Sequence, residues 1–149
     1  MKAVSYPDAV EPSLVGTYDP LAKSGGGYVW DDVLEYRVWC HPERGAARID
    51  GGNDYYQAFA TYEEALAFSR STPGAEEPLA LIRQLEYLAE PEPGQYRHMK
   101  QLRIAEWPVA FLGRPRRTPH TIPDFLAPDA PPNRLDILRG IAGNDPLQD

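Results

Sequence analysis

Proline and aromatic residues occupy different parts of this 149-residue chain. Ten of the 16 prolines lie outside residues 28–111, whereas 13 of the 16 aromatic residues lie inside that range. Aromatic side chains bury much of the area of a core, and proline interrupts both helices and sheets. The distribution predicts a core domain over residues 28–111. A flexible N-terminal arm (1–27), ending in a Gly-rich linker, and a proline-rich segment (112–149) flank it.

The composition limits the classes of protein to which the chain can belong. The length suits one domain, and 42% hydrophobic residues argue against disorder throughout. No apolar run approaches the roughly 18–20 residues that span a bilayer, and the first residues lack the apolar stretch of a secretory signal. Cys40 is the one cysteine, which excludes a disulfide framework within the chain. We therefore expect a cytoplasmic protein with no membrane contact. Its net charge of −7 disfavours nucleic acid as a partner.

Hydrophobic periodicity predicts the first elements. Strict alternation over residues 33–40 is typical of a half-buried strand, with Leu34, Tyr36, Val38 and Cys40 on one face. Residues 55–60 follow as a second strand, which can pair with the first through a long loop. Thr61 and Glu64 then have the spacing of a capping box, which predicts a helix from Tyr62 to about Arg70.

Residues 79–89 fit two interpretations. Leu81, Leu85 and Leu88 have helical spacing, but alternate residues also fit a strand face. A turn-like segment at 90–95 and a second alternating run at 96–104 favour a hairpin, so we prefer strand. The predicted fold is α+β: a small antiparallel sheet in the order β-β-α-β-β with one packed helix and extended Pro-rich ends. Asn133 is expected to cap a short C-terminal amphipathic helix, with Leu135, Ile137, Leu138 and Ile141 on its apolar stripe.

The candidate contact residues fall into two groups. The first surrounds the end of the 33–40 strand, and the second is the basic cluster Arg114-Pro115-Arg116-Arg117, which could dock an acidic partner, a phosphate or the protein's own acidic surface. Cys40 itself is expected to be a small core residue. His41, Asp50, Asp54 and His98 lack the spacing of a metal motif, so no metal site is assigned. The candidates for contact with a ligand or partner are Trp39, His41, Arg44, Asp54, Tyr55, Tyr56, Arg114, Arg116 and Arg117.

The chain also has more aromatic residues than a small sheet with one helix can cover. On alternating strands some of these rings must face away from the helix. The terminal segments could cover them, or the rings could line a pocket or the interface of a homodimer.

Residues 35–45, 52–56 and 106–109 resemble a family of small bacterial proteins labelled GCN5-related N-acetyltransferases. The similarity runs from about Val29 to Gly140. It implies acetyl transfer from acetyl-CoA on a larger α/β fold, with the pyrophosphate held by an Arg/Gln-x-x-Gly-x-Gly/Ala loop between a strand and a helix. The nearest match to that loop is Arg48–Asn53, which ends in Asn53 and leads into the predicted strand 55–60.

Two functions follow as hypotheses. The first is a small binding or regulatory module without catalysis of its own and without a cofactor, acting on an unknown protein or small molecule. The alternative is an acetyltransferase-like protein that uses acetyl-CoA, for which no catalytic residue is assigned.

Overall fold

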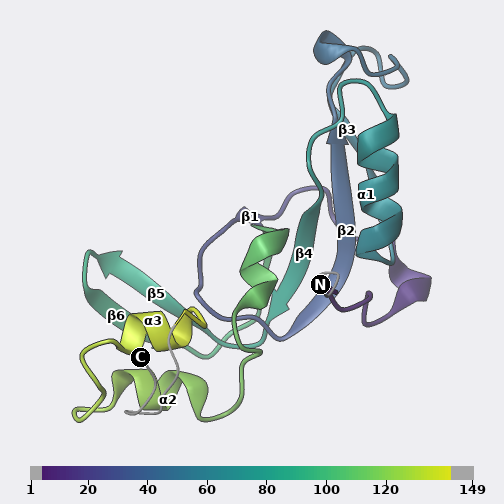
Figure 1. Cartoon of the computed structure of the whole chain (residues 1–149). Coiled ribbons are helices and arrows are strands. Elements are labelled where there is room, and N and C mark those ends of the chain that lie inside the picture. The colour runs from purple at the N-terminus through teal and green to yellow at the C-terminus, as the bar shows by residue number, and fades with distance from the viewer. Residues whose placement is uncertain (1–4, 142–149) are drawn as a thin grey trace.

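The computed structural model describes residues 5–141 and contains two sheets, consistent with the predicted α+β class. The larger sheet has the strand order β1-β7-β4-β2-β3, in which β1 runs parallel to β7 and the other neighbours are antiparallel. A two-stranded hairpin, β5-β6, forms the second sheet and lies at the end of the molecule where α2 and α3 are found (Figure 1). The strands are β1 (Lys23–Ser24), β2 (Asp32–Cys40), β3 (Tyr55–Phe59), β4 (Leu79–Gln84), β5 (Tyr87–Glu92), β6 (Gln95–Met99) and β7 (Arg103–Pro108). The helices are α1 (Tyr62–Ser71), α2 (Thr121–Leu126) and α3 (Arg134–Leu138), with short 3-10 helices η1 (Pro12–Leu14), η2 (Pro42–Arg44) and η3 (Val109–Gly113).

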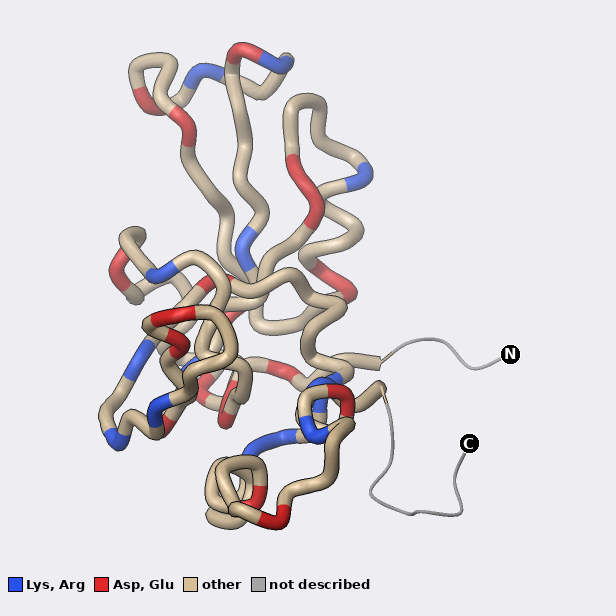
Figure 2. Tube along the Cα trace, turned by 90° about the vertical axis from the view of Figure 1, so that its left-hand side faces the viewer, with Lys and Arg blue, Asp and Glu red and all other residues tan. Residues whose placement is uncertain are grey.

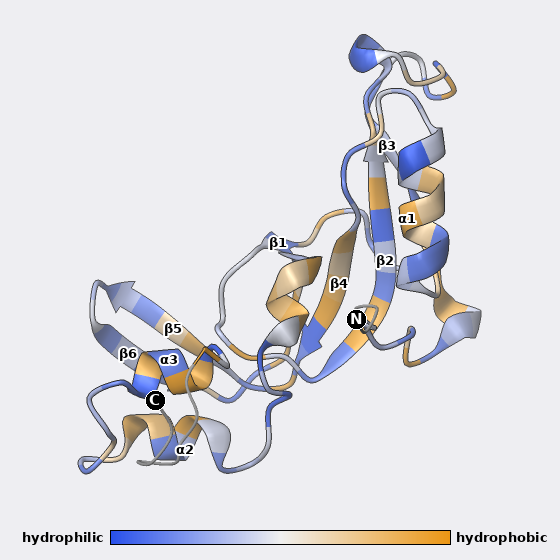
Figure 3. Cartoon of the chain, viewed as in Figure 1, coloured by the Kyte–Doolittle hydropathy of each residue, from blue (hydrophilic) through white to orange (hydrophobic). Residues whose placement is uncertain are grey.

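The first strand pair follows the sequence prediction closely. β2 pairs with β3 through the long loop 41–54, and its alternation is visible in the hydropathy colouring (Figure 3). A register shift between Val33 and Glu35 changes which residues at the start of β2 face the core. Because a bulge reverses which side chains face the core, Val33 joins the main core cluster, which does not include the predicted Leu34.

The predicted order β-β-α-β-β with one packed helix is not what the structure shows. Residues 79–89 are extended, as preferred, but the run breaks at Leu85, whose backbone N–H donates to Asp31 Oδ2 at 2.7 Å. A second break between Met99 and Arg103 separates β6 from β7. Each long predicted strand is therefore split, with one half in the five-stranded sheet and the other in the hairpin. The described residues also contain three α-helices where the sequence predicted two.

Helix α1 covers one face of the sheet. Thr61 caps it by accepting from the backbone N–H of Glu64 at 3.2 Å, while the Glu64 carboxylate accepts from the Thr61 hydroxyl and not from its amide. Ala65 is fully buried against the sheet. The side chains that form this main core come from β2 and the segment before it, β4, β7, α1 and η3. They include Trp30, Val33, Tyr36, Val38, Ala80, Ile82, Ala105, Trp107, Val109 and Leu112.

The N-terminal segment, predicted as a flexible arm, lies against the sheet over the described residues 5–27. Its backbone bonds to the core domain at Ala9 and Val10, and the Tyr36 hydroxyl donates to the carbonyl of Pro7. Further along, residues 16–20 pass over the face opposite α1, and Lys23–Ser24 adds β1 beside β7. The segment thus covers part of the sheet face opposite α1, which a single helix could not cover.

The C-terminal segment packs on the hairpin and not on the five-stranded sheet. Helix α2 was not predicted, because its sequence contains Pro123; proline is tolerated in a first helical turn, whose N–H groups lack intrahelical partners anyway. Asn133 precedes α3 as expected, but its side chain makes no capping hydrogen bond, and Ile141 is 71% exposed. A second core cluster forms here from Val29, Leu88, Ile122, Phe125 and Leu138.

Within residues 5–141 no helix has the length and apolar character needed to cross a membrane.

Candidate functional site

The predicted contact residues divide between two distant places. Trp39, near the end of β2, pairs with Tyr56 near the start of β3, and the neighbouring Tyr55 pairs with Cys40. Trp39 packs on Tyr56 with ring centroids 4.9 Å apart, and its indole N–H donates to Glu106 Oε2 at 2.9 Å. The Tyr55 hydroxyl donates to the carbonyl of Ala47 at 2.8 Å. These rings are committed to contacts within the chain.

His41 and Asp54 do come together at this end of the sheet. His41 Nδ1 lies 2.9 Å from Asp54 Oδ1, and Nε2 lies 2.5 Å from Glu76 Oε2. The hydrogen bond to Glu76, and then the contact with Asp54, raise the pKa of His41 above its ordinary value. Arg44 is exposed in η2 nearby. Cys40 is fully buried, and desolvation raises the pKa of its thiol, in keeping with a core residue.

The predicted basic cluster contacts the protein's own surface. Arg117 pairs with Asp31 at 2.8 Å, and the guanidinium of Arg116 lies 4.9 Å from the centroid of the Trp30 ring. Arg114 also contacts its own chain: its guanidinium lies over the rings of Phe111 and Trp107 and donates to the carbonyl of Tyr28 at 3.2 Å. Arg114 additionally borders open space.

That open space is a groove of about 520 Å³, here called the arginine groove, between the hairpin, the 25–28 loop and the C-terminal segment. It continues past Arg114 and Arg139 into an adjoining hollow that reaches Ile141. Its volume falls within the roughly 300–1,000 Å³ typical of small-molecule sites. The residues that line it are Gly26, Gly27, Tyr28, Tyr87, Leu88, Ala89, Glu90, Arg103, Phe111, Arg114 and Arg139.

The wall formed by the 25–28 loop is rigidly positioned. The loop was predicted as a flexible linker, but its glycines have positive φ, and buried Gln84 donates to the carbonyls of Gly26 and Val29 at 3.0 and 2.8 Å. A Cβ at Gly27 would lie 2.2 Å from Gln84 Nε2, so only glycine fits. Tyr28 also has φ +69°, the one positive φ among described non-glycine residues. Backbone strain of this kind concentrates at functional sites.

Three arginines face one carboxylate in the groove. Glu90 already accepts from the Tyr28 hydroxyl and from the Gly94 N–H, and these bonds lower the pKa of Glu90. Burial, together with Glu90, raises the pKa of Tyr28 to about 12. The groove therefore carries a local excess of positive charge, although acidic positions are spread over the whole chain (Figure 2).

The positions of these arginines are electrostatically unfavourable. Burial lowers the pKa of Arg103 and Arg114, and the nearby charge of Arg139 lowers that of Arg114 further. Since a guanidinium keeps its charge at neutral pH, deprotonation does not remove this cost. Arg139 Nε is buried and has no hydrogen-bond partner among the described residues. A bound anion would offset the repulsion between Arg114 and Arg139.

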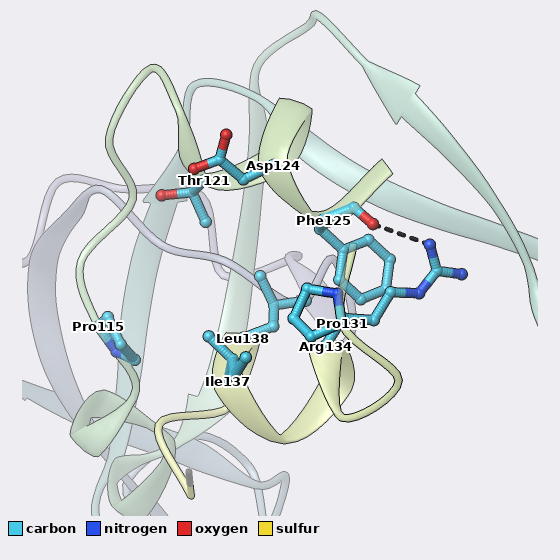
Figure 4. A pocket seen from close by; sticks show the side chains of 8 residues that line it. All are labelled: Pro115, Thr121, Asp124, Phe125, Pro131, Arg134, Ile137 and Leu138. Atoms are coloured by element: carbon cyan, nitrogen blue, oxygen red, sulfur yellow. Dashed lines mark hydrogen bonds between the residues drawn. The ribbon is translucent and has the colours of Figure 1, made fainter. Parts of the chain in front are cut away.

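A smaller pocket lies between α2 and α3 (Figure 4). Its lining includes Phe125, Ile137 and Leu138, and Arg134 crosses its edge to donate to the carbonyl of Phe125 at 2.8 Å. The volume is about 190 Å³, below the usual range for a small-molecule site. We interpret it as a packing gap between two short helices.

Sequence reasoning identified Arg114 but missed the other groove residues. Arg103 and Arg139 are 36 positions apart along the chain, and neither belongs to a motif. Gly25-Gly26-Gly27 was the available signal, because consecutive glycines mark either a linker or a tight loop with positive φ. At the other end of the sheet, Glu43 lies two positions from His41 in the sequence, whereas Glu76 reaches His41 only through the fold. The loop Arg48–Asn53, matched to the acetyl-CoA motif, leads to strand β3 and not to a helix.

Comparisons of the chain with protein-family models, with curated proteins and with solved structures found no match.

Proposed function

We propose that the chain is a small binding module whose ligand is a small organic anion held in the arginine groove. The observation that carries the proposal is the convergence of Arg103, Arg114 and Arg139 on one groove whose single carboxylate, Glu90, is already hydrogen bonded. A carboxylate or phosphate group of the ligand would lie against the guanidinium groups, which recognise such groups through paired hydrogen bonds.

The remaining lining fits the apolar part of such a ligand. Leu88, Tyr87 and Phe111 supply hydrophobic and aromatic surface beside the charged wall. Sites of this kind combine a mostly apolar lining with a few fixed polar groups. The 25–28 loop, fixed by Gln84 and Trp107, supplies a wall that need not reorganise when the ligand binds.

Isothermal titration of the full chain at low salt tests the proposal. The probes are inorganic pyrophosphate, citrate and acetyl-CoA, with glycerol as the neutral comparison. Arg139→Met removes a guanidinium that makes few contacts, and we expect it to weaken anion binding about 10- to 100-fold, the value of one hydrogen bond to a charged group. Arg70→Met, on the exposed side of α1, removes the same charge far from the groove and should leave binding unchanged.

The outcomes separate the hypotheses. Equal affinity in the two variants, or no binding of any anionic probe, contradicts the proposal. Tight binding of acetyl-CoA with no binding of pyrophosphate or citrate would instead favour the acetyltransferase alternative that the sequence resemblance implies.

A further inference from the structure

A second group of side chains, separate from the arginine groove, gathers where β2 ends. His41, Glu43 and Asp54 place one ligand-type atom each within 4.8 Å of one another. His41 follows β2, Glu43 lies in η2, and Asp54 immediately precedes β3. Glu76 approaches the same imidazole from the segment after α1. Three stretches of chain thus meet here, namely the segment 41–43, Asp54 and Glu76.

The backbone of His41 is held firmly in this position. Its N–H donates to the carbonyl of Gly74 at 2.9 Å, and its own carbonyl accepts from Arg44 and Ala46 at 2.9 and 3.2 Å. Gly74 has φ +76°, and a Cβ there would lie 2.4 Å from the Ala46 nitrogen. The 73–76 segment can therefore approach His41 closely only with glycine at position 74, and this approach brings Glu76 to the ring.

The two ring nitrogens of His41 have different partners. Nε2 forms a short hydrogen bond to Glu76 Oε2 at 2.5 Å, which fixes the orientation of the ring. Nδ1 is buried and lies 2.9 Å from Asp54 Oδ1, yet the geometry of that contact is not that of a hydrogen bond. Nδ1 is therefore a buried nitrogen that has a carboxylate oxygen beside it but no hydrogen-bond partner among the described residues.

We propose that His41 Nδ1, Asp54 and Glu43 bind a divalent transition-metal ion such as Zn²⁺, with Glu76 orienting the imidazole from behind. One imidazole and two carboxylates match the ligand preferences of Zn²⁺, and a carboxylate on the far ring nitrogen is the usual support of a metal-bound histidine. Three protein ligands leave a fourth position for water or for a ligand atom.

The spacing and the charge both suit this ion. Ligand atoms about 2.1 Å from a tetrahedral zinc ion lie roughly 3.4 Å from one another. The carboxylates of Asp54 and Glu43 are exposed, so side-chain rotation can bring them to that separation. Three carboxylates around one imidazole give the group an excess of negative charge, which a divalent cation neutralises more fully than a single proton does.

Titration of the chelator-treated full chain with ZnCl₂ tests the proposal, with calorimetry for stoichiometry and Co²⁺ absorption for coordination. We expect one ion per chain and a visible Co²⁺ spectrum of a four-coordinate site. Asp54→Asn and Glu43→Gln change exposed side chains, so the variants should fold, and each should weaken binding at least tenfold. Glu76→Gln should weaken it about 10- to 100-fold, as loss of a supporting carboxylate does.

His98→Ala is the matched control. His98 also has a glutamate on Nε2, with Glu86 Oε1 at 2.8 Å, but it belongs to no three-ligand group among the described residues. This variant should bind Zn²⁺ as the unmodified chain does, whereas His41→Ala should not bind. Absence of Zn²⁺ binding by the unmodified chain, or full binding by Asp54→Asn and Glu43→Gln, overturns the proposal.

Discussion

The residue that departs furthest from ordinary burial rules is Arg37, whose side chain is fully buried in the sheet. Its guanidinium donates to Glu35 and Glu106 at 2.7 and 3.1 Å and to the carbonyls of Asp19 and Pro20. It also lies 4.4 Å from the centroid of the Tyr56 ring. A buried charge is tolerable only when its hydrogen bonds are satisfied, and this network satisfies it with the N-terminal segment.

Replacing Arg37 with methionine should therefore destabilise the fold by about 3–5 kcal/mol, because Glu35 would remain as a buried carboxylate without its cation. Urea denaturation followed by tryptophan fluorescence measures the loss. The double variant Arg37→Met with Glu35→Gln should recover part of it. Arg44→Met, at an exposed position, is the control. A single variant as stable as the control would show that the network contributes nothing.

Cys40 supports a second prediction at the same scale. Its side chain is fully buried at the end of β2, and desolvation raises the pKa of the thiol, so little thiolate forms at neutral pH. A thiol reagent should label the native protein only as fast as the structure opens, whereas denatured protein should react at once. Cys40→Ala should cost about 1–2 kcal/mol of stability. Immediate labelling of the native chain would contradict the burial of this residue.

At the scale of elements, two hydrogen bonds hold the β5-β6 hairpin to the 25–28 loop. The Tyr28 hydroxyl donates to the Glu90 carboxylate, and the Leu88 N–H donates to the carbonyl of Gly27 at 3.0 Å. The Gly94 N–H also donates to Glu90, within the hairpin itself. The same hairpin supplies Leu88 and Tyr96 to the second core cluster, so its position affects both the groove and the docking of α2 and α3. An isolated two-stranded hairpin is marginally stable in water, which makes these contacts necessary.

The hydrogen bonds at Glu90 predict a specific acid dependence. Because they lower the pKa of Glu90 in the folded state, the carboxylate contributes stability above its unfolded pKa. That contribution is lost as the pH falls through the lowered folded value. The difference in unfolding free energy between the unmodified chain and Glu90→Gln should therefore shrink between about pH 7 and pH 2. Glu92→Gln, on the same strand, should show a weaker dependence, and equal curves would contradict the role of Glu90.

At the scale of the whole molecule, the core is divided into two clusters, and this division bears on how the parts of the fold are stabilised. The main cluster lies between the five-stranded sheet, α1 and η3, and the second lies between the hairpin and the two C-terminal helices. These helices are far too short to be stable alone, so they depend on packing. The arginine groove lies beside the second cluster, which places the proposed ligand site next to the part of the fold with the smaller core.

Truncating Phe125 should reveal this division. Phe125→Ala removes a nearly fully buried ring from the second cluster, at a cost of about 3–5 kcal/mol where the site cannot collapse. Native-state hydrogen exchange should then show lost protection in α2, α3 and the hairpin, with β2, β4 and β7 still protected. A uniform loss of protection over all strands would show that the two clusters unfold together. Ala65→Gly changes the main cluster instead, and it provides the comparison for a loss of protection that starts on that side of the fold.

Local signals in the sequence determined the elements whose structure depends on neighbours along the chain. Alternation specified β2, and the Thr61 cap specified where α1 begins, because both patterns act within a few residues. Only the tertiary structure decided where the predicted strands break, since the break at Leu85 depends on Asp31, 54 positions away. The same holds for the 25–28 loop, whose conformation depends on Gln84, and for both candidate sites. Long-range packing, which no local pattern encodes, brings together the residues of each site. In the groove these are Arg103, Arg114 and Arg139, and at the end of β2 they are His41, Asp54 and Glu76.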